Sequence, residues 1–479
     1  MENNQEIRLI TSERGGNLIV FNNHKYRFIR RRKDNIEKWT CTNNKCTASL
    51  LVEKVEKNGE NQLSVKEVLG EHFHSTIATS KIERQVLKEN CKRKAVESVS
   101  TRPVKIIRTE LIKGIDTSVL QHKDLKSVRK AIYCEKRKIY PALPKNLIEA
   151  VTELRNMKTN DVFKYRDQQF IYVHDEKNLI CITTKDNLNF MVNCTTFLAD
   201  GTFDFAPNHF LQMYTIHCYQ NRYYVPLVFF FLENKSKTTY IDMWNYLKDL
   251  CLITTSKVLE IKYLHLDFEI GAHEAVRETF PGVTIFGCRF HLAQAWWRKI
   301  NEDKILKNAY KDENSEFGNW LKMFFGLPFL QHTEVEDGFI QLMALCPNEL
   351  YGHRFADYIL KTYVEPGCLF PPVLWAKEPS QHPRTTNAAE SFHRTINRQF
   401  YCTRPPIYAV IQTLLETQEE TSLKLNSIQQ GTVQKASKAE EEKISKTIQS
   451  YINYCQKKSS EGLIKYLTHL GNLYRGIIL

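Results

Sequence analysis

Short apolar or alternating runs separated by turn residues mark the first part of the chain. Pairs of Gly and Asn residues separate these runs, which lie at 18–21, 26–29, 46–52 and 63–68. Runs of this length bounded by Gly and Asn are typical of β-strands joined by tight turns. The sequence therefore predicts a small β module over residues 8–76. Its core is small, so an additional cross-link would help to stabilise it.

The pattern changes to helical spacing after residue 76. Residues 77–150 are rich in Lys and Arg and contain Lys-Arg-Lys runs at 92–94 and 136–138. We expect a basic helical linker that ends at the turn between Pro141 and Pro144. Each basic run fits either a nuclear-import signal or a solvated helix face.

Strands and helices alternate over residues 160–299. Strand-like runs lie at 197–205, 210–219, 223–232, 261–266 and 283–286, and helical patterns lie at 238–251, 271–279 and 290–300. The resulting order is three strands, helix, strand, helix, strand, helix. This order matches the topology of ribonuclease-H-like folds, so we predict an α/β core of that kind.

The remaining segments read as helical. Residues 300–380 have no counterpart in the minimal fold, which predicts a helical insertion. Residues 381–400 carry the final helix of the core, and residues 401–479 form a C-terminal helical tail. The longest apolar stretch, 223–232, contains Pro226 and is too short to cross a bilayer. The first ten residues lack the layout of a secretion signal. Membrane and secreted classes are therefore disfavoured.

The positive charge is confined to the first third of the chain. Residues 1–150 carry 31 Lys and Arg against 18 Asp and Glu, whereas residues 151–479 carry 36 of each. A basic region ahead of a neutral body indicates binding to a polyanion, with nucleic acid as the usual partner. A merely soluble basic domain would have the same charge.

Cysteine and histidine spacing predicts a metal site in the β module. The chain has 13 cysteines, an odd number that argues against a complete disulfide framework and favours thiols or metal ligands. Cys41, Cys46, His72 and His74 follow the pattern C-x4-C-x25-H-x-H. Two thiolates and two imidazoles form the closed tetrahedral site that suits structural Zn²⁺. On spacing alone, unrelated Cys and His residues remain an alternative.

Three acidic residues lie where catalysis can use them. Asp200 lies in an apolar strand, where an unpaired carboxylate is costly, and Asp267 ends the fourth strand. The first and fourth strands are neighbours in the predicted topology, so the two aspartates meet, and they then need a cation. On the final helix, Asn387, Glu390 and His393 recur at intervals of three along one face.

Two aspartates and one glutamate form a hard oxygen site that suits Mg²⁺. Two ions held about 3.5–4 Å apart in such a site promote the displacement at a phosphodiester. We therefore predict Asp200, Asp267 and Glu390 as catalytic residues that use Mg²⁺ or Mn²⁺. Taken alone, each acid also fits a turn, a helix cap or a solvated surface.

Cys288 and His291 begin the helix that follows the fifth strand. Their spacing suggests a metal, but a second Cys/His pair with suitable spacing is not evident nearby. A histidine on this helix can instead orient DNA or a phosphate. The remaining alternative is the start of a packed helix.

Residues 8–76 resemble FLYWCH-type zinc fingers. The residue types that name this family are represented by Leu18, Phe21, Tyr26, Trp39, Cys41 and the final histidines. The resemblance implies that Cys41, Cys46, His72 and His74 are the zinc ligands. It also makes the run Arg30, Arg31, Arg32 and Lys33 a phosphate-contacting surface. The family includes both DNA-binding and protein-binding modules.

Residues from about 195 to 400 resemble the transposase domain of Mutator-like elements. The motifs that match, in family order, are Asp200-Gly-Thr-Phe203, Leu266-Asp267-Phe-Glu269, Gly287-Cys288-Arg-Phe-His291 and Asn387-Ala-Ala-Glu390-Ser-Phe-His393. The resemblance implies a ribonuclease-H-like DDE core with Asp200, Asp267 and Glu390 as its triad. It implies a helical insertion between Asp267 and Glu390. It also makes Cys288, His291, Asn387 and His393 auxiliary active-site residues, and not a zinc site.

We therefore predict a nuclear DNA transposase. Its finger and basic helices bind terminal inverted repeats, and its core cleaves double-stranded DNA and joins it to target DNA. Holding two ends together calls for a homo-oligomer, and no membrane partner is expected. One alternative is a domesticated, non-catalytic DNA-binding regulator of transcription or chromatin on the same scaffold. Another is a zinc-dependent adaptor that binds proteins.

Overall fold

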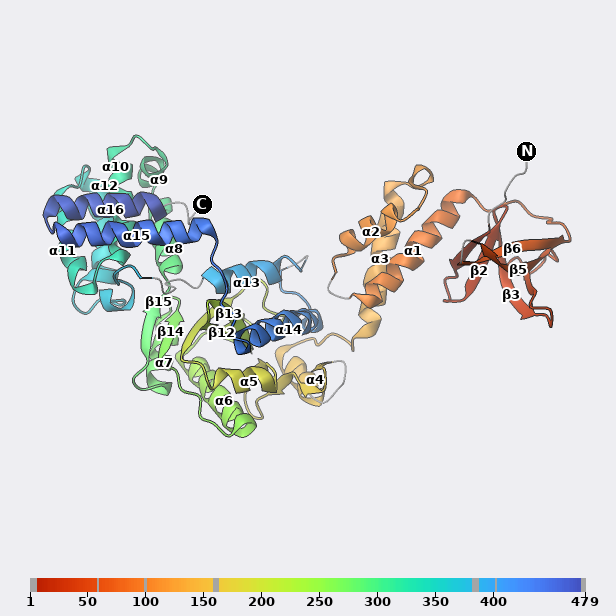
Figure 1. The fold of residues 1–479 in the computed structure, drawn as a ribbon, viewed down its shortest axis with the longest axis horizontal. Helices are drawn as coiled ribbons and strands as arrows, with labels where there is room; N and C mark the ends of the chain where they lie inside the picture. The colour runs from red at the N-terminus through yellow and green to blue at the C-terminus, as the bar shows by residue number, and fades with distance from the viewer. Residues whose placement is uncertain are drawn as a thin grey trace. The chain divides into compact units, whose positions relative to one another are not determined.

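The computed structural model describes residues 7–57, 60–98, 101–157, 163–380, 387–400 and 403–474 (Figure 1). Side chains 56–62 and 387–390 lie outside this description. The chain divides into two compact units, Met1–Leu143 and Pro144–Leu479. The boundary between the two units lies at Leu143 and Pro144. Within the described ranges, no helix is both long and apolar enough to cross a bilayer.

An antiparallel sheet forms the first part of the N-terminal unit. Over its described residues, each of six strands pairs with the next in the chain. The strands are β1 (Arg8–Thr11), β2 (Asn17–Phe21), β3 (His24–Arg31), β4 (Glu37–Cys41), β5 (Ser49–Lys57) and β6 (Glu60–Leu69). Asn22 and Asn23 both have positive φ in the β2–β3 hairpin, which explains why Asn occupies this two-residue turn. Ile19, Tyr26, Trp39 and Leu50 form the core of the sheet.

Helices complete the N-terminal unit. They are α1 (Thr79–Glu97), α2 (Pro103–Ile112), η1 (Thr117–Val119) and α3 (His122–Ile139). Leu87 and Val128 belong to the core that α1, α2 and α3 share. Ile82 of α1 packs against Ile10 and Val20 of the sheet. This apolar contact joins the β module to the helices.

A mixed sheet organises the C-terminal unit. Its order among the described residues is β15-β14-β11-β12-β13-β10-β9. The bounds are β9 (Ile171–Val173), β10 (Ile180–Ile182), β11 (Thr196–Thr202), β12 (Gln212–Gln220), β13 (Tyr223–Leu232), β14 (Tyr263–Leu266) and β15 (Thr284–Gly287). β11 is antiparallel to β12 and parallel to β14, and β14 is parallel to β15. The five strands predicted from the sequence are present, whereas β9 and β10 were not predicted. A separate short hairpin pairs β7 (Lys164–Tyr165) with β8 (Gln168–Gln169).

Helices before, between and after the strands of this sheet pack in the same unit. They are α4 (Leu147–Met157), α5 (Lys185–Met191), α6 (Lys237–Thr255), α7 (Ile270–Thr279) and α8 (Arg289–Glu302). The face of α6 predicted to be apolar is buried, with Tyr240, Met243 and Trp244 in the core. The helices α6, α7 and α8 stand at the positions in the chain where the hydrophobic pattern placed them.

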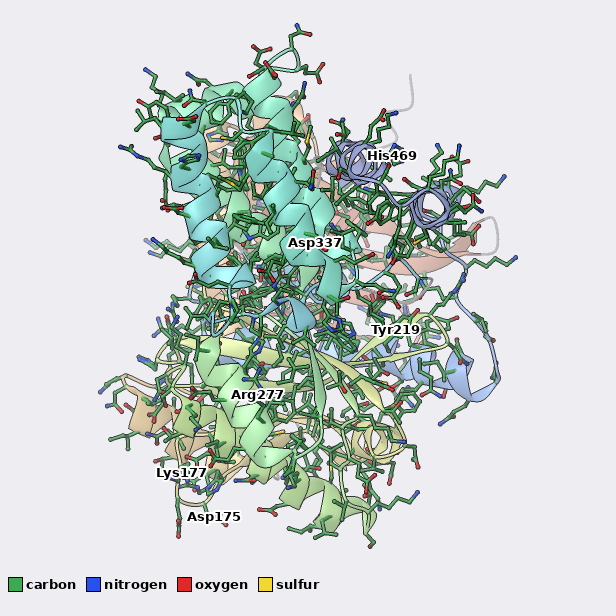
Figure 2. All side chains as sticks on the ribbon, turned by 90° about the vertical axis from the view of Figure 1, so that its left-hand side faces the viewer. Asp175, Lys177, Tyr219, Arg277, Asp337 and His469 are labelled. Carbon is green, nitrogen blue, oxygen red and sulfur yellow. The ribbon has the colours of Figure 1, made fainter. Side chains whose placement is uncertain are left out.

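Helices also fill the segment predicted as an insertion. They are α9 (Lys304–Lys311), α10 (Glu316–Met323), α11 (Val335–Ala344) and α12 (Glu349–Ile359), with the short turns η3 (Phe324–Phe329), η4 (His332–Glu334), η5 (Leu360–Val364) and η6 (Pro372–Leu374). In the C-terminal region, α13 (Asn387–Asn397) contacts β11 and β13, and α14 (Ile407–Gln429) packs on β13. The last helices, α15 (Lys438–Gln456) and α16 (Ser460–Tyr474), pack on each other, and α16 also packs on α10 and α11. In Figure 2, His469 of α16 lies in the upper part of this unit, Asp337 of α11 lies nearer its middle, and Lys177, between β9 and β10, lies near its lower end.

Candidate metal centres and active site

Sulfur and nitrogen donors converge in the N-terminal unit. Cys41 ends β4, Cys46 lies in the loop before β5, and His72 and His74 follow β6. Their donor atoms all lie within 4.8 Å of one another. Cys41 Sγ is 3.3 Å from His74 Nε2, and Cys46 Sγ is 3.3 Å from His72 Nδ1. The structure thus brings together all four predicted ligands, and this donor set fits a structural Zn²⁺ ion.

Neighbouring groups orient the two imidazoles. His72 Nε2 is 2.8 Å from Tyr26 Oη, and its ring stacks on His24 with centroids 3.5 Å apart. His74 turns its Nδ1 toward the carbonyl of Ser75, at 3.1 Å. Metal-binding histidines are typically held in this way through their second nitrogen. Sequence reasoning missed this role for His24 and Tyr26, although their alternation on β3 places both side chains on the same side of the sheet.

The predicted basic run lies at the end of β3 and in the turn after it. Arg30 to Lys33 are all exposed. Arg31 differs from the others because its Nη2 is 2.6 Å from Glu37 Oε1, and Glu37 is buried. Arg30, Arg32 and Lys33 form no ion pair with any described residue. Arg31 therefore supports the sheet, while the other three are available to a ligand.

The carboxyl ends of three parallel strands meet in the C-terminal unit. Leu198 of β11 pairs with His265 of β14, and this register continued by two residues places Asp200 beside Asp267. Cys288 directly follows β15, the next parallel strand. Ligand atoms of Asp200, Asp267 and His291 all lie within 4.8 Å of one another. The two predicted aspartates are therefore adjacent, and His291 of α8 shares their site.

The Asp200 carboxylate is buried and strongly oriented. Its Oδ1 accepts a hydrogen bond from the Gly201 amide at 2.9 Å, and its Oδ2 is 3.4 Å from His393 Nδ1. Burial alone raises the pKa of this carboxyl, but His393, His291 and the Gly201 amide outweigh burial and hold the pKa below its usual range. Asp200 is therefore an anion inside the protein, ready to bind a cation.

A buried polar chain runs from His393 into strand β12. Thr215 lies opposite Asp200 in the β11–β12 register, and its hydroxyl donates to the Asp200 carbonyl at 3.2 Å. His393 Nε2 lies 2.9 Å from the Thr215 hydroxyl, and His217 Nε2 lies 3.2 Å from it. Burial, with the charges of His393 and Lys424, lowers the pKa of His217 to about 3, so this ring is neutral. These hydrogen-bonded side chains connect α13 to β12, the strand that pairs with β11 at Asp200.

Asp267 is held by its own backbone surroundings. Its Oδ1 accepts a hydrogen bond from the Phe268 amide at 2.6 Å, and His273 Nε2 is 2.7 Å from its carbonyl oxygen. Its side chain is about half exposed, at 47%. Glu269 is turned aside, because Tyr240 donates to its Oε2 at 3.0 Å. Asp267 therefore combines a fixed position with access to solvent.

The His291 ring lies beside the two aspartates. Its Nδ1 is 3.5 Å from Asp267 Oδ1. Burial alone lowers the pKa of His291, but the hydrogen bond and charge of Cys288, together with Asp200 and Asp267, outweigh burial and raise it to about 10. An imidazolium here offsets part of the carboxylate charge in the absence of a metal ion. The site fits a divalent cation because two carboxylates converge on it, with the His291 ring beside them.

The predictions for Asn387 and Glu390 concern side chains outside the described part of the chain. The backbone of α13 is described, and Glu390 stands three residues before His393 on it. Residues three apart lie on one face of a helix. Glu390 is therefore about one turn from the residue that contacts Asp200.

Sequence reasoning also missed Thr215, His217 and His273. The signal for Thr215 and His217 is their alternation on an apolar strand, which points two polar side chains to the same face. The signal for His273 is a histidine in the first turn of a helix that starts just after Asp267. Buried polar groups of this kind need partners, and here the partners lie in the candidate site.

These observations define a protein with a zinc-finger module in one unit and an acidic centre on an α/β sheet in the other. Two protein-family models match the chain: the FLYWCH zinc finger domain at residues 9–74 and the MULE transposase domain at residues 196–295. The chain therefore carries a FLYWCH zinc finger ahead of a MULE transposase domain, as the resemblance predicted. A search of curated proteins finds no match. The second matched segment contains Asp200, Asp267 and His291 and ends before α13.

Proposed function

We propose that this protein is a DNA transposase of the Mutator-like type with a ribonuclease-H-like DDE core. The observation that carries the proposal is the adjacency of Asp200 and Asp267 at the ends of parallel strands, with His291 beside them. All three lie inside the segment that matches the MULE transposase domain. Such a protein acts on nuclear double-stranded DNA, recognises terminal inverted repeats and assembles as a homo-oligomer around two ends.

Two further features support a ribonuclease-H-like core. The strands β13, β12, β11, β14 and β15 lie side by side in that order. The first three are antiparallel, and the later two continue in parallel after helical crossovers. This arrangement supports the proposal of a ribonuclease-H-like core. The helix α13 contacts β11, which supports Glu390 as the third member of the triad.

Asp200, Asp267 and Glu390 would hold Mg²⁺ or Mn²⁺. When bound, such ions promote attack at phosphorus and stabilise the leaving oxygen. In the first reaction, water attacks a phosphodiester, the bond from phosphorus to the 3′ oxygen breaks, and that oxygen takes a proton. In the second, the freed 3′-hydroxyl attacks a target phosphodiester and displaces another 3′ oxygen. The role of His393 is to orient Asp200, and His291 is placed to contact a DNA phosphate.

Nicking of supercoiled plasmid by the purified full chain tests this proposal. We expect nicking in Mg²⁺ or Mn²⁺ and a fall of about a thousandfold in Asp200→Asn, because several kcal/mol of charge stabilisation are lost. Asp204→Asn is the matched control, since Asp204 is exposed and four residues away. Equal nicking by Asp200→Asn would contradict the catalytic assignment. DNA binding without any metal-dependent nicking would favour the non-catalytic regulator.

A further inference from the structure

Helix α3 carries a concentration of positive charge outside both matched segments. It contains seven Lys and Arg residues and two acidic residues. The zinc-finger match ends at residue 74 and the transposase match begins at residue 196. Neither match therefore accounts for this charge. The positions of these Lys and Arg residues around the helix decide whether they share one exposed face.

The charge lies on the face of α3 that points away from the core. Val128 and Ile132 are buried against α1 and α2. Lys123, Lys126, Lys130 and Arg137 are all exposed, and their spacing of three, four and seven residues places them along one side of a helix. Tyr133 is also exposed on this face. We call these five residues the α3 basic face.

The two acidic residues of α3 do not neutralise this face. Asp124 is buried, accepts a hydrogen bond from the Gln121 amide at 3.0 Å and pairs with Arg84 at 3.2 Å. Glu135 pairs with Lys138 at 2.8 Å. Within the described ranges, the four cations of the α3 basic face form no ion pair. The positive charge of these four side chains therefore remains available to an anionic ligand.

The basic run of α1 provides a contrast within the same unit. Lys92 lies 2.8 Å from Glu89, and Lys94 lies 2.5 Å from Glu97. Arg93 lies 3.8 Å from Glu97 as well. Each of the three cations thus has a carboxylate within its own helix. The three cations at 92–94 therefore share two carboxylate partners, Glu89 and Glu97, whereas the α3 basic face has no such partner among the described residues.

We propose that the α3 basic face binds double-stranded DNA, with the helix lying in the major groove. The stripe from Lys123 to Arg137 is about 21 Å long at 1.5 Å per residue, and the major groove of B-DNA admits an α-helix. Lysines along the helix would contact phosphates on either side. The deep, narrow groove of A-form RNA excludes a helix, so DNA is the better match. The inference rests on the proposed function, which makes DNA the ligand, and adds a second DNA-binding surface beside the finger.

Fluorescence anisotropy of the full chain with a labelled mixed-sequence DNA duplex tests the inference. We expect Lys123→Gln/Lys126→Gln/Lys130→Gln to weaken binding on the order of 100-fold near 0.1 M salt. The slope of log K against log salt should fall by roughly 3, about one for each lost phosphate contact. Lys92→Gln/Arg93→Gln/Lys94→Gln removes the same charge and should change affinity by less than about threefold. The triple arginine variant at 123, 126 and 130 should retain binding.

Equal losses in the two glutamine variants would overturn the inference, because net charge alone would then explain binding. Stronger binding of an RNA duplex than of the DNA duplex would overturn the DNA assignment. If the α3 variant binds DNA normally while wild-type protein nicks plasmid, the inference fails and the proposed function stands. If wild-type protein binds no DNA, both fail. Zinc content and thermal unfolding verify that the variants are folded.

Discussion

The two groups of candidate metal ligands differ in ligand chemistry and in exposure to solvent. The N-terminal cluster offers two thiolates and two imidazoles, and Cys41 and Cys46 are buried. The C-terminal cluster offers carboxylates with one imidazole, and the side chain of Asp267 is 47% exposed. Four protein ligands around a zinc ion leave no coordination position for a substrate. Carboxylates that fill only part of the coordination shell of a cation leave positions that water or a substrate can occupy.

This difference assigns different roles to metal binding in the two units. The N-terminal sheet has a small core, so closing the chain from Cys41 to His74 through a metal adds folding free energy. The C-terminal sheet has a large core of its own, centred on residues such as Phe197, Leu264 and Trp244. We therefore expect that unit to fold without a metal. The first cluster therefore stabilises structure, and the second is suited to chemistry.

The largest effect should follow from removing one ligand of the N-terminal group, Cys41, Cys46, His72 and His74. We expect Cys46→Ser to lose bound zinc and to unfold the β module, because zinc binding by small modules is worth roughly 10–16 kcal/mol. Hydrogen exchange resolved by segment measures this, with loss of protection in β1 to β6 and unchanged protection in β11 to β15. Cys134→Ser is the control, since Cys134 is an exposed free thiol of the same unit. Full protection of the β module after chelation of zinc would contradict the assignment.

The sequence predicts well what depends on local pattern. The spacing of Cys41, Cys46, His72 and His74 suggested a metal site and left unrelated residues as an alternative, and the resemblance to FLYWCH zinc fingers then implied the four ligands. Asp200 and Asp267 were found because a charged residue interrupts or ends an apolar strand, and strand order then makes the two neighbours. Both predictions use short segments and a rule of topology.

The rest depends on contacts that spacing does not encode. The resemblance implied that His393 is an active-site residue, but its contacts with Asp200 and Thr215 come from a helix far away in the chain, and no local pattern predicts those partners. The strands β9 and β10 are three residues each, too short for a periodic signal. The Lys-Arg-Lys runs at 92–94 and 136–138 were visible in the sequence. Only the structure shows that the first run pairs with acids of its own helix and that, of the second run, Arg137 alone belongs to the α3 basic face.

An intermediate effect should follow from removing the Thr215 hydroxyl, which links His393, beside Asp200, to β12. Thr215→Val leaves His393 Nε2 and His217 Nε2 without a partner that now lies 2.9 Å and 3.2 Å away. We expect a loss of about 1–3 kcal/mol in the free energy of unfolding. Mn²⁺ affinity should fall roughly 10–100-fold, because a group that orients a ligand is lost. Titration calorimetry with Mn²⁺ and urea unfolding measure the two quantities.

Thr215→Ser is the matched variant because it restores the hydroxyl. It should recover Mn²⁺ affinity to within a few-fold of wild type. If Thr215→Val lost stability but bound Mn²⁺ normally, the polar chain would serve folding alone. The polar groups beside Asp200 would then have a structural role, as the N-terminal zinc ligands do, and no role in metal binding.

The smallest effect should follow from removing the hydroxyl that orients a ligand of the N-terminal group, that of Tyr26 beside His72. Tyr26→Phe removes the hydroxyl 2.8 Å from His72 Nε2 and leaves the ring in the core. We expect zinc affinity to fall by about tenfold, since partners of metal-binding histidines typically contribute 10–100-fold. We place it at the low end because stacking on His24 still fixes the His72 ring. Competition with a zinc-chelating dye measures the affinity, and Tyr133→Phe on α3 should leave it unchanged. Loss of zinc as complete as in Cys46→Ser would mean that orientation of His72, and not the closed ligand set, holds this cluster together.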